Sequence, residues 1–366
     1  MSHLLFINHT RQLHGSEQVM LHSMRVAQAA GHRVTVVLPS HVADEGLDAA
    51  VEAYASRVLR LPYRPIGIGW WRTMLVQVSN LYALCRLVRY ICREKVDVVY
   101  SNTSVTSIGV QAARWTGRKH LWHFHEPVDK LYGWNATLKG VYRRLLGTKR
   151  NTLICISKRQ LGEWEQAVGQ SLPATVVYNP VREIQVKRVA HKGIRIGFLG
   201  CFETRKNISV LLRAVEQISE TVADVQLVLC GAKNEEEKRA IYRQTTLTES
   251  SLDVRLHTND VAAFFWEIDI LVLPSLQETM PLVVMEALQA GVCVIQTTHS
   301  GLSELLRDGE DTLFFAPEQP ETLVALLRTC MDGDVRERLA ANGRRRVKEL
   351  DCNKRFEVAM QQLFAS

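Results

Sequence analysis

Two glutamates lie on either side of a proline in the apolar stretch QETMPLVVMEALQAGVCVI, residues 277–295. On one continuous helix Glu278 and Glu286, eight positions apart, would be separated by roughly 80° around the axis. Pro281 predicts that a helix begins near it, because proline is best tolerated in the first helical turn. Glu278 then precedes the helix, and Glu286 lies about one turn inside it. This arrangement predicts an anion-binding site at a helix N-terminus.

A short basic segment could supply the positive charge that an anionic ligand needs. GCFETRKN, residues 200–207, follows the apolar run IRIGFLG and contains Arg205, Lys206 and Asn207. Fixed cations stabilise negative charge, so Arg205 and Lys206 are candidates for contact with an anionic ligand. A solvated charged turn is the alternative interpretation.

Two histidines end the apolar run in HLWHFHEP, residues 120–127. On a strand His123 and His125 point to the same side, because side chains alternate between faces. Ligands of α/β proteins bind beyond the carboxyl ends of strands, so His125 is a candidate for ligand contact. We interpret His123 as a structural residue. A metal site on the H-x-H pair is an alternative for which the sequence suggests no third ligand.

LHGSE, residues 13–17, comes just after the first apolar run. Gly15 and Ser16 would let the backbone approach a ligand closely, since glycine has no Cβ. Glu17 also fits an ordinary helix start, with Ser16 as the N-cap and a carboxylate in the first turn. The two interpretations are compatible.

The segment DGD, residues 332–334, matches a D-x-D pattern that binds a metal ion in some enzymes. It lies in a polar stretch between two expected C-terminal helices, far from any strand end. We therefore predict a structural turn in which Asp334 is an N-cap. No metal site is expected.

Short β-rich runs alternate with amphipathic segments through most of the chain, and these elements must position the candidate residues. The alternation predicts parallel sheets covered by helices. The charged segment 181–193 separates two series, which predicts two doubly wound, Rossmann-like α/β domains facing across a cleft. We expect residues 1–185 to form the first domain and 186–366 the second, with the final helices packing back on the first. The expected strands are 4–8, 33–39, 96–102, 120–125, 152–157, 174–180, 194–200, 225–231, 254–258, 269–275 and 292–297.

Composition excludes several classes of protein. The 366 residues are 46% hydrophobic and 23% charged, as in soluble globular proteins, and no apolar run reaches the roughly 18 residues of a membrane span. The start lacks a signal-peptide core, and the eight cysteines are scattered, so a reducing cytoplasm is expected. Neither G-x-G-x-x-G nor G-x-x-x-x-G-K-[ST] follows a strand, which argues against dinucleotide enzymes and P-loop ATPases.

The net charge of +7 belongs to the N-terminal part of the chain. Residues 1–150 hold 20 Lys and Arg against 9 Asp and Glu, whereas the remainder holds 25 against 29. Docking on an anionic membrane surface and solvated faces of packed helices are both compatible with this pattern. Nucleic acid is not expected, because no binding motif accompanies the charge. The basic and aromatic residues concerned are Trp70, Trp71, Arg72, Arg86, Arg89, Arg93, Arg143, Arg144, Lys149 and Arg150.

Residues 269–315, DILVLPSLQETMPLVVMEALQAGVCVIQTTHSGLSELLRDGEDTLFF, resemble the retaining, nucleotide-sugar-dependent glycosyltransferases of family 4, which have the two-domain GT-B fold. They contain that family's E-x7-E pattern, the preceding PS, the A-x-G turn and the later G-x-x-E-x-x-x-x-G run. Residues 14–37 resemble its first loop, helix and second strand. The resemblance spans nearly the whole chain.

The resemblance assigns roles to the candidate residues. Glu286 would accept hydrogen bonds from the ribose hydroxyls of a nucleotide, and Glu278 would hold hydroxyls of the donor sugar. Lys206 matches the family's lysine, whereas Cys201 stands where the family has an arginine. Arg205 would supply that second cation from a shifted position. The other implied donor-site residues are Gly15, Ser16, Asn207, Met280, Pro281, Leu282 and Val283, of which Pro281 has no N–H to donate.

The implied activity is transfer of a hexose from a nucleotide-sugar to a saccharide or lipid-linked acceptor, in cell-surface polysaccharide or glycolipid biosynthesis. His125, Lys206 and Glu278 are the expected catalytic residues, and no metal or other cofactor is expected. The enzyme would be cytoplasmic, or peripheral on the cytoplasmic face of a membrane. Two alternatives stay open: a non-catalytic nucleotide-sugar-binding protein, which the Cys201 replacement favours, and a nucleotide-sugar epimerase, for which we identify no acid–base pair.

Overall fold

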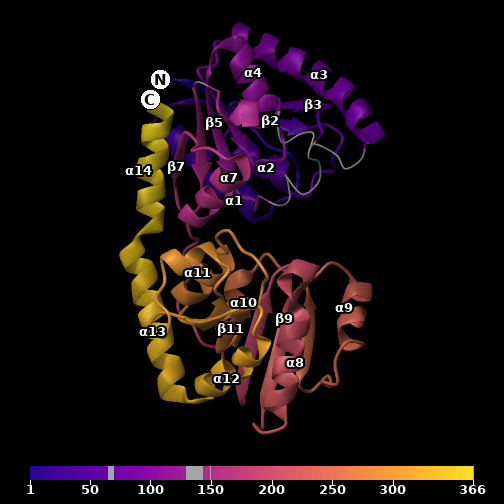
Figure 1. Cartoon of the computed structure of the whole chain (residues 1–366), viewed down its shortest axis with the longest axis vertical. Helices are drawn as coiled ribbons and strands as arrows, with labels where there is room; N and C mark the ends of the chain where they lie inside the picture. Colours follow the sequence, from indigo (N-terminus) through magenta and orange to yellow (C-terminus); the bar gives the residue numbers. More distant parts are fainter. Residues whose placement is uncertain (65–69, 129–142, 149, 366) are drawn as a thin grey trace. The chain divides into compact units, whose positions relative to one another are not determined.

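A computed structural model describes residues 1–64, 70–128, 143–148 and 150–365, with the backbone alone for 70–78. The described chain forms two compact units. The N-terminal unit comprises Met1–Pro180 and Cys352–Ser366, and the C-terminal unit comprises Val181–Asp351. Each contains a parallel sheet with helices packed against it (Figure 1). These two doubly wound sheets confirm the expected α/β class.

The sheet of the N-terminal unit has the order β3-β2-β1-β4-β5-β6-β7. Every residue of the central strands β1 and β4 is buried, as in parallel sheets covered on both faces. The strands are β1 (His3–Ile7), β2 (Arg33–Pro39), β3 (Arg57–Leu61), β4 (Val98–Asn102), β5 (Lys119–Phe124), β6 (Asn151–Cys155) and β7 (Ala174–Val176). The described helices are α1 (Gly15–Ala29), α2 (Leu47–Glu52), α3 (Trp70–Arg93), α4 (Ile108–Thr116), α7 (Lys158–Val168) and α14 (Cys352–Ala365).

The sheet of the C-terminal unit has the order β10-β9-β8-β11-β12-β13. Its strands are β8 (Ile194–Leu199), β9 (Val225–Ala232), β10 (Leu252–Leu256), β11 (Ile270–Leu273), β12 (Cys293–Thr297) and β13 (Leu313–Phe315). Its helices are η1 (Thr204–Lys206), α8 (Ile208–Ser219), α9 (Glu235–Tyr242), α10 (Val261–Glu267), α11 (Leu282–Gln289), η2 (Gly301–Glu304), α12 (Pro320–Met331) and α13 (Gly333–Leu350).

Two edge strands were not expected from the sequence. β3 pairs only with β2 and exposes Arg57 and Arg60, so its sequence RVLRL lacks a buried strand's continuous apolar run. β13 is three residues long and pairs with β12. A strand at the edge of a sheet has a neighbouring strand on one side only. It is therefore less buried than a central strand and needs fewer apolar residues.

The last helix belongs to the N-terminal unit, although it follows the whole C-terminal unit in the chain. α14 packs beside α1 (Figure 1). Its apolar face buries Phe356, Met360 and Phe364, and the Phe364 ring lies 6.0 Å from that of Phe6 in β1. The units divide between Pro180 and Val181, five residues before the boundary expected from the sequence. The hydrophobic face of α14 therefore completes the core of the N-terminal unit.

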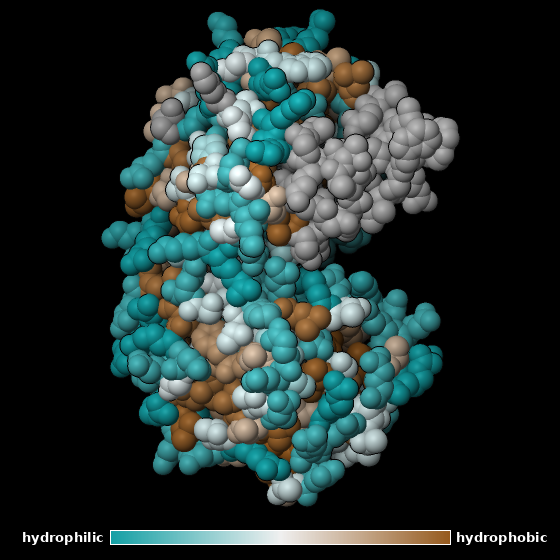
Figure 2. Space-filling model, viewed as in Figure 1, coloured by the Kyte–Doolittle hydropathy of each residue, from teal (hydrophilic) through white to brown (hydrophobic). Residues whose placement is uncertain are grey.

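The outer surface is mixed in character. On the face that Figure 2 shows, hydrophobic side chains are interspersed among hydrophilic ones in both units. No helix of the described residues is both long enough and apolar enough to cross a membrane.

Candidate functional site

Glu278 lies in the loop between β11 and α11, and its backbone is fixed by a second loop. The Glu278 N–H donates to the carbonyl of His299 at 2.9 Å, and the Gly301 N–H donates to the carbonyl of Glu278 at 3.1 Å. The Thr297 hydroxyl also donates to the carbonyl of Ser275 at 2.7 Å. The loops after β11 and β12 are thereby joined at the carboxyl edge of the sheet, where ligands of open α/β sheets bind.

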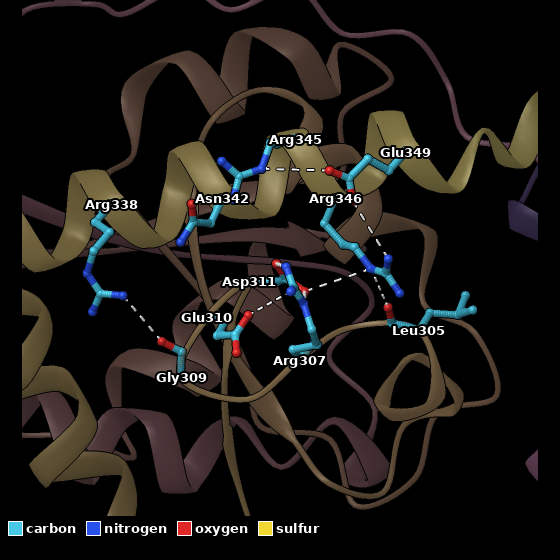
Figure 3. Close-up of polar contacts among 10 residues, drawn as sticks. All are labelled: Leu305, Arg307, Gly309, Glu310, Asp311, Arg338, Asn342, Arg345, Arg346 and Glu349. Carbon is cyan, nitrogen blue, oxygen red and sulfur yellow. Dashed lines mark hydrogen bonds and ion pairs between the residues drawn. The ribbon is translucent and has the colours of Figure 1, made fainter.

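The second loop, which follows β12 and contacts the backbone of Glu278, continues into a network of arginines and carboxylates (Figure 3). Asp311 is fully buried and accepts hydrogen bonds from Nε and Nη2 of Arg307, at 2.9 and 2.7 Å. Burial alone would raise the pKa of Asp311, but the Arg307 hydrogen bonds outweigh it and lower that pKa. Arg346 of α13 donates to the carbonyl of Leu305 at 2.9 Å. Helix α13 therefore braces the segment that leads from Gly301 to β13.

Helix α11 starts where the sequence predicts. Pro281 is its N-cap, in an extended conformation with φ −71° and ψ 109°. Met280 and Pro281 are buried, and Leu282 and Val283 are half-buried in the first turn. The first amides of a helix lack intrahelical partners, so this turn can bind an anion.

Glu286 lies inside α11 with 8% of its surface exposed. Burial raises the pKa of its carboxyl, and the positive charge of Arg182 partly opposes that rise. Arg182 Nε lies 3.9 Å from Oε1 of Glu286. The expected cations of residues 200–207 thus meet Glu278, whereas Glu286 has a different basic neighbour.

Arg205 and Lys206 meet at the carboxylate of Glu278. Lys206 Nζ donates to Oε1 at 2.5 Å, and Arg205 Nη1 lies 3.6 Å from Oε2. Lys206 and Glu278 are each only 9% exposed, so this pair has little solvent screening. The carbonyl of Arg205 accepts from the N–H of Leu276 at 2.8 Å, which ties the short helix η1 to the loop that carries Glu278.

The segment before η1 depends on a close backbone approach. The Gly200 N–H donates to the carbonyl of Cys230 at 3.0 Å. A Cβ added at Gly231 would lie 2.1 Å from the carbonyl oxygen of Gly200, so only glycine fits there. Cys201, at the position of the family's arginine, is half-buried, and Asn207 adopts a left-handed conformation with φ 53° before α8.

In the N-terminal unit, His125 and Ser16 are joined through Asn102, the last residue of β4. His125 Nε2 lies 3.0 Å from Asn102 Oδ1, and Asn102 Nδ2 donates to the carbonyl of Ser16 at 3.3 Å. Desolvation lowers the pKa of His125 to about 4, so the ring is neutral at pH 7. The predicted histidine and the predicted loop therefore belong to one hydrogen-bonded group.

Helix α1 begins two residues earlier than an N-cap at Ser16 would imply. It starts at Gly15, and His14 is the N-cap. Ser16 lies inside the first turn and donates to Oε2 of Glu17 at 2.9 Å, and the same carboxylate accepts from the His14 N–H at 3.3 Å. The prediction of Ser16 as N-cap is wrong. The Glu17 carboxylate accepts hydrogen bonds from both the His14 N–H and the Ser16 hydroxyl, and His14 is the N-cap.

The remaining candidates have structural contacts. His123 is fully buried, and its Nδ1 lies 2.5 Å from the hydroxyl of Tyr100, in keeping with a structural role. In DGD, Asp332 rather than Asp334 is the N-cap of α13, because its carboxylate accepts from the Asp334 amide at 2.9 Å. Among the described residues, no three His, Cys, Asp or Glu side chains form a group suited to a metal ion.

Two protein-family models together match most of the chain. The one described as Glycosyltransferase Family 4 matches residues 13–183, and the one described as Glycosyl transferases group 1 matches residues 181–346. The chain belongs to the family 4 glycosyltransferases. An uncharacterised glycosyltransferase of Methanocaldococcus jannaschii is 25% identical over 265 residues, 71% of this chain and 73% of that protein. Phosphatidyl-myo-inositol mannosyltransferase of Mycobacterium leprae is 32% identical over 171 residues, 43% of each chain.

Solved structures show the same fold. This glycosyltransferase and Anabaena HepE, crystallised with UDP, have a TM-score of 0.82 at 18% identity over the whole of both chains. Sucrose-phosphate synthase of Thermosynechococcus elongatus gives a TM-score of 0.81 at 17% identity, covering 100% of this chain and 98% of that one. These similarities identify the fold as GT-B.

Two residues in these clusters were missed by sequence reasoning. Arg182 falls in the charged segment taken as a boundary between domains, where a basic residue carries no signal of its own. Asn102 ends an apolar run, and its significance depends on which strands are neighbours in the sheet. A polar residue at the end of a central strand was the only signal available for Asn102.

Proposed function

We propose that this glycosyltransferase moves a hexose from a nucleoside diphosphate sugar to a saccharide or lipid-linked acceptor, with retention of anomeric configuration. The observation that carries the proposal is the meeting of Arg205 and Lys206 at the Glu278 carboxylate, just before the N-terminus of α11. Cations, a helix N-terminus and a carboxylate are the groups that a diphosphate and a sugar hydroxyl require. Crystals of Anabaena HepE with UDP and with UDP-glucose support a donor of this class.

In the proposed complex the diphosphate competes with Glu278 for Lys206. The lysine then neutralises the leaving group, and Glu278 turns from the lysine toward hydroxyl groups of the donor sugar. The half-buried first turn of α11, at Leu282 and Val283, supplies backbone amides to the phosphates. Glu286, in its ionised form, accepts hydrogen bonds from the ribose.

We propose a front-face reaction, because sequence reasoning identified no carboxylate in the position of a nucleophile. The bond between the anomeric carbon and the diphosphate oxygen breaks, and the bond to the acceptor oxygen forms on the same face. The acceptor's proton passes to an oxygen of the departing diphosphate. On this proposal no metal ion is needed, since Lys206, Arg205 and the helix N-terminus offset the charge that develops.

Thermal unfolding with UDP, GDP, ADP and CMP, with and without Mg²⁺, tests the donor site. A ligand that binds only the folded protein raises its melting temperature, by an amount corresponding to about 2.7 kcal/mol at one hundred times Kd. We expect one nucleoside diphosphate to produce a shift that is independent of Mg²⁺ and smaller in Glu286→Gln than in the wild-type protein. A protein stabilised by none of the four nucleotides would refute the proposal.

A non-catalytic nucleotide-sugar-binding protein is the second candidate, and the observation that favours it is Cys201. A half-buried thiol there leaves the diphosphate with one cation fewer from the family's usual position. Binding without release of nucleoside diphosphate in the presence of candidate acceptors, together with turnover gained in Cys201→Arg, would establish this second function.

We also propose that the N-terminal unit docks on an anionic lipid surface. The exposed face of α3 carries Leu81, Tyr82, Arg86 and Arg89, with the two apolar side chains 53% and 54% exposed. Neighbouring α4 adds Trp115, which is 57% exposed. Residues 53–93 contain no Asp or Glu, so the charge is complementary to anionic headgroups.

Of the other basic and aromatic residues singled out from the sequence, some are exposed and some lie outside the described residues. Arg93, Arg143, Arg144 and Arg150 are exposed. The side chains of Trp70, Trp71 and Arg72, together with residues 138–142 and Lys149, lie outside the described residues. The docking proposal therefore depends on the described faces of α3 and α4.

A further inference from the structure

Asn8 and Asn102 lie at the switch point of the N-terminal sheet. From β1 the chain passes to β2 and β3 on one side, and it returns on the other side of β1 as β4. Asn8 follows β1 and Asn102 ends β4, so both lie at the carboxyl edge between the two diverging halves. This is the place where open α/β sheets bind ligands. Both asparagines are fully buried.

The contacts of these two side chains fix the orientation of both amides. Asn8 Nδ2 donates to the carbonyl of Thr10 at 2.9 Å, and Asn102 Nδ2 donates to the carbonyl of Ser16 at 3.3 Å. A backbone carbonyl can only accept, so the atom facing it must be the nitrogen of the amide. Asn102 Nδ2 also donates to Asn8 Oδ1 at 2.9 Å, which uses its second hydrogen. Asn102 therefore presents Oδ1, an acceptor, to His125.

The tautomer of His125 follows from that orientation. Its Nε2 lies 3.0 Å from Asn102 Oδ1, and two acceptors cannot form a hydrogen bond. Nε2 must therefore carry the proton. In a neutral ring the lone pair is then on Nδ1, which makes Nδ1 the acceptor atom. The backbone carbonyls of Thr10 and Ser16 thus determine which atom donates in each hydrogen bond from Asn8 through Asn102 to His125.

We propose that Asn102 is a positioning residue that holds His125 in the Nε2–H tautomer and ties it to the loop of Gly15 and Ser16. The proposal rests on the proposed function in so far as His125 contacts the donor sugar. A ring in this tautomer accepts a hydroxyl hydrogen at Nδ1 and does not donate from that atom. One side chain thereby sets both the hydrogen-bonding character of the histidine and its place relative to the loop.

A second asparagine–histidine pair, at the other end of β5, provides a matched control. His120, near the opposite end of β5, has Nδ1 2.6 Å from Asn151 Oδ1 and Nε2 2.9 Å from the Ser101 hydroxyl. Asn151 Nδ2 donates to the carbonyl of Leu146 at 3.2 Å, so its Oδ1 is again the acceptor. His120 is therefore the Nδ1–H tautomer. The two rings, one near the start of β5 and one just after its end, are predicted to have opposite protonation patterns.

Two-bond ¹H–¹⁵N correlation spectra of the full-length protein with ¹⁵N-labelled histidine test the proposal at neutral pH. Resonances are assigned by their loss in His125→Gln and His120→Gln. We expect His125 to show a protonated Nε2 and a bare Nδ1, and His120 to show the reverse. A bare Nε2 on His125 in the wild-type protein would overturn the proposal without any Asn102 variant.

Variants then isolate the role of Asn102. Asn102→Ala removes the acceptor, and we expect the His125 pattern to move toward a tautomer mixture while that of His120 stays unchanged. Asn151→Ala should do the opposite. Asn8→Ala should preserve the His125 tautomer, because the Ser16 carbonyl still orients the Asn102 amide. An unchanged His125 pattern in folded Asn102→Ala would refute the assignment.

Transfer kinetics separate this inference from the proposed function. We expect kcat to fall at least tenfold in Asn102→Ala, with a new dependence on pH, and to stay within twofold in Asn151→Ala. Equal losses in the two variants, in proportion to their loss of stability, would reduce Asn102 to a purely structural residue. The predicted tautomer in a protein that binds none of the nucleotides would support the His125 assignment while refuting the donor proposal.

Discussion

The charge balance of the proposed donor site depends on Lys206. Its ammonium group donates a hydrogen bond to the Glu278 carboxylate, and the pair is nearly buried. We predict that Lys206→Met lowers kcat on the order of 10²–10³-fold, as loss of one group that stabilises developing charge does in other enzymes. Release of nucleoside diphosphate measures the effect. Lys192→Met is the control, because Lys192 is 84% exposed and pairs with Asp224. Equal rates in Lys206→Met and wild type would contradict the proposed role.

Glu286 gives the site a predictable dependence on pH. Burial raises the pKa of this carboxyl above its ordinary 4.5, so it takes up a proton at a higher pH than a solvent-exposed glutamate. The ionised form accepts ribose hydroxyls, and we predict that nucleotide affinity falls as the pH is lowered through that raised pKa. Calorimetric titrations at a series of pH values from about 4 to 8 measure the affinity.

Substitution of Arg182 provides a second test of the role of Glu286. Its positive charge lowers the pKa of Glu286, so Arg182→Ala should move the midpoint of the affinity curve to higher pH. Glu286→Gln should abolish the dependence, because an amide does not titrate. A midpoint that stays in place in Arg182→Ala, or a dependence that persists in Glu286→Gln, would assign the titration to another group.

At the level of elements, the ends of β8 and β9 are held in close backbone contact by Gly231. We predict that Gly231→Ala lowers the free energy of unfolding by ~1–3 kcal/mol, since its Cβ would lie 2.1 Å from the Gly200 oxygen. Nucleotide affinity should fall as well, because Gly200 leads into Cys201 and η1. Urea unfolding and the same titrations measure the two effects.

The control for that substitution is Gly162→Ala, within helix α7. A Cβ at Gly162 would have no atom within 4 Å, and alanine favours helix, so the variant should be up to ~1 kcal/mol more stable. A Gly231→Ala protein with wild-type stability and affinity would show that the strand ends tolerate separation.

Most elements could be predicted because their buried faces leave a period in the sequence. β1 and β4 contain the buried apolar runs LLFI and VVY, and α11 has a proline at its start. β3 and β13 were not predicted, because β3 carries two exposed arginines and β13 has only three residues. The resemblance placed Lys206 and Glu278 in one site, but it did not predict that their side chains form an ion pair. The Asn102 contacts were not, because they depend on the order of strands in the sheet.

At the scale of the whole molecule, the excess positive charge is confined to the N-terminal part of the sequence. We predict that Arg86→Glu/Arg89→Glu abolishes sedimentation with vesicles containing phosphatidylglycerol, because it reverses two charges on the exposed face of α3. Attraction to such vesicles should also weaken as salt rises, since each basic residue contributes about 1 kcal/mol near an anionic surface.

The matched control is Arg239→Glu/Arg243→Glu, which makes the same charge change on exposed residues at α9 in the C-terminal unit. That helix also carries Glu235, Glu236 and Glu237 in its first turn. Sedimentation that is indifferent to salt, to lipid charge and to the α3 reversal would exclude electrostatic docking. Equal loss in both double variants would leave only a general effect of net charge.

The position of α14 has a consequence for how the protein is made. A ribosome releases the strands of the N-terminal unit first, yet the side chains that close its core, Phe356, Met360 and Phe364, emerge only after the whole C-terminal unit. At ordinary elongation rates that gap lasts on the order of ten seconds or more, during which the C-terminal unit can form. A nascent chain that stops before α14 leaves an open apolar groove for chaperones and proteases to recognise. Completion of the N-terminal unit therefore requires that the whole C-terminal unit has been translated.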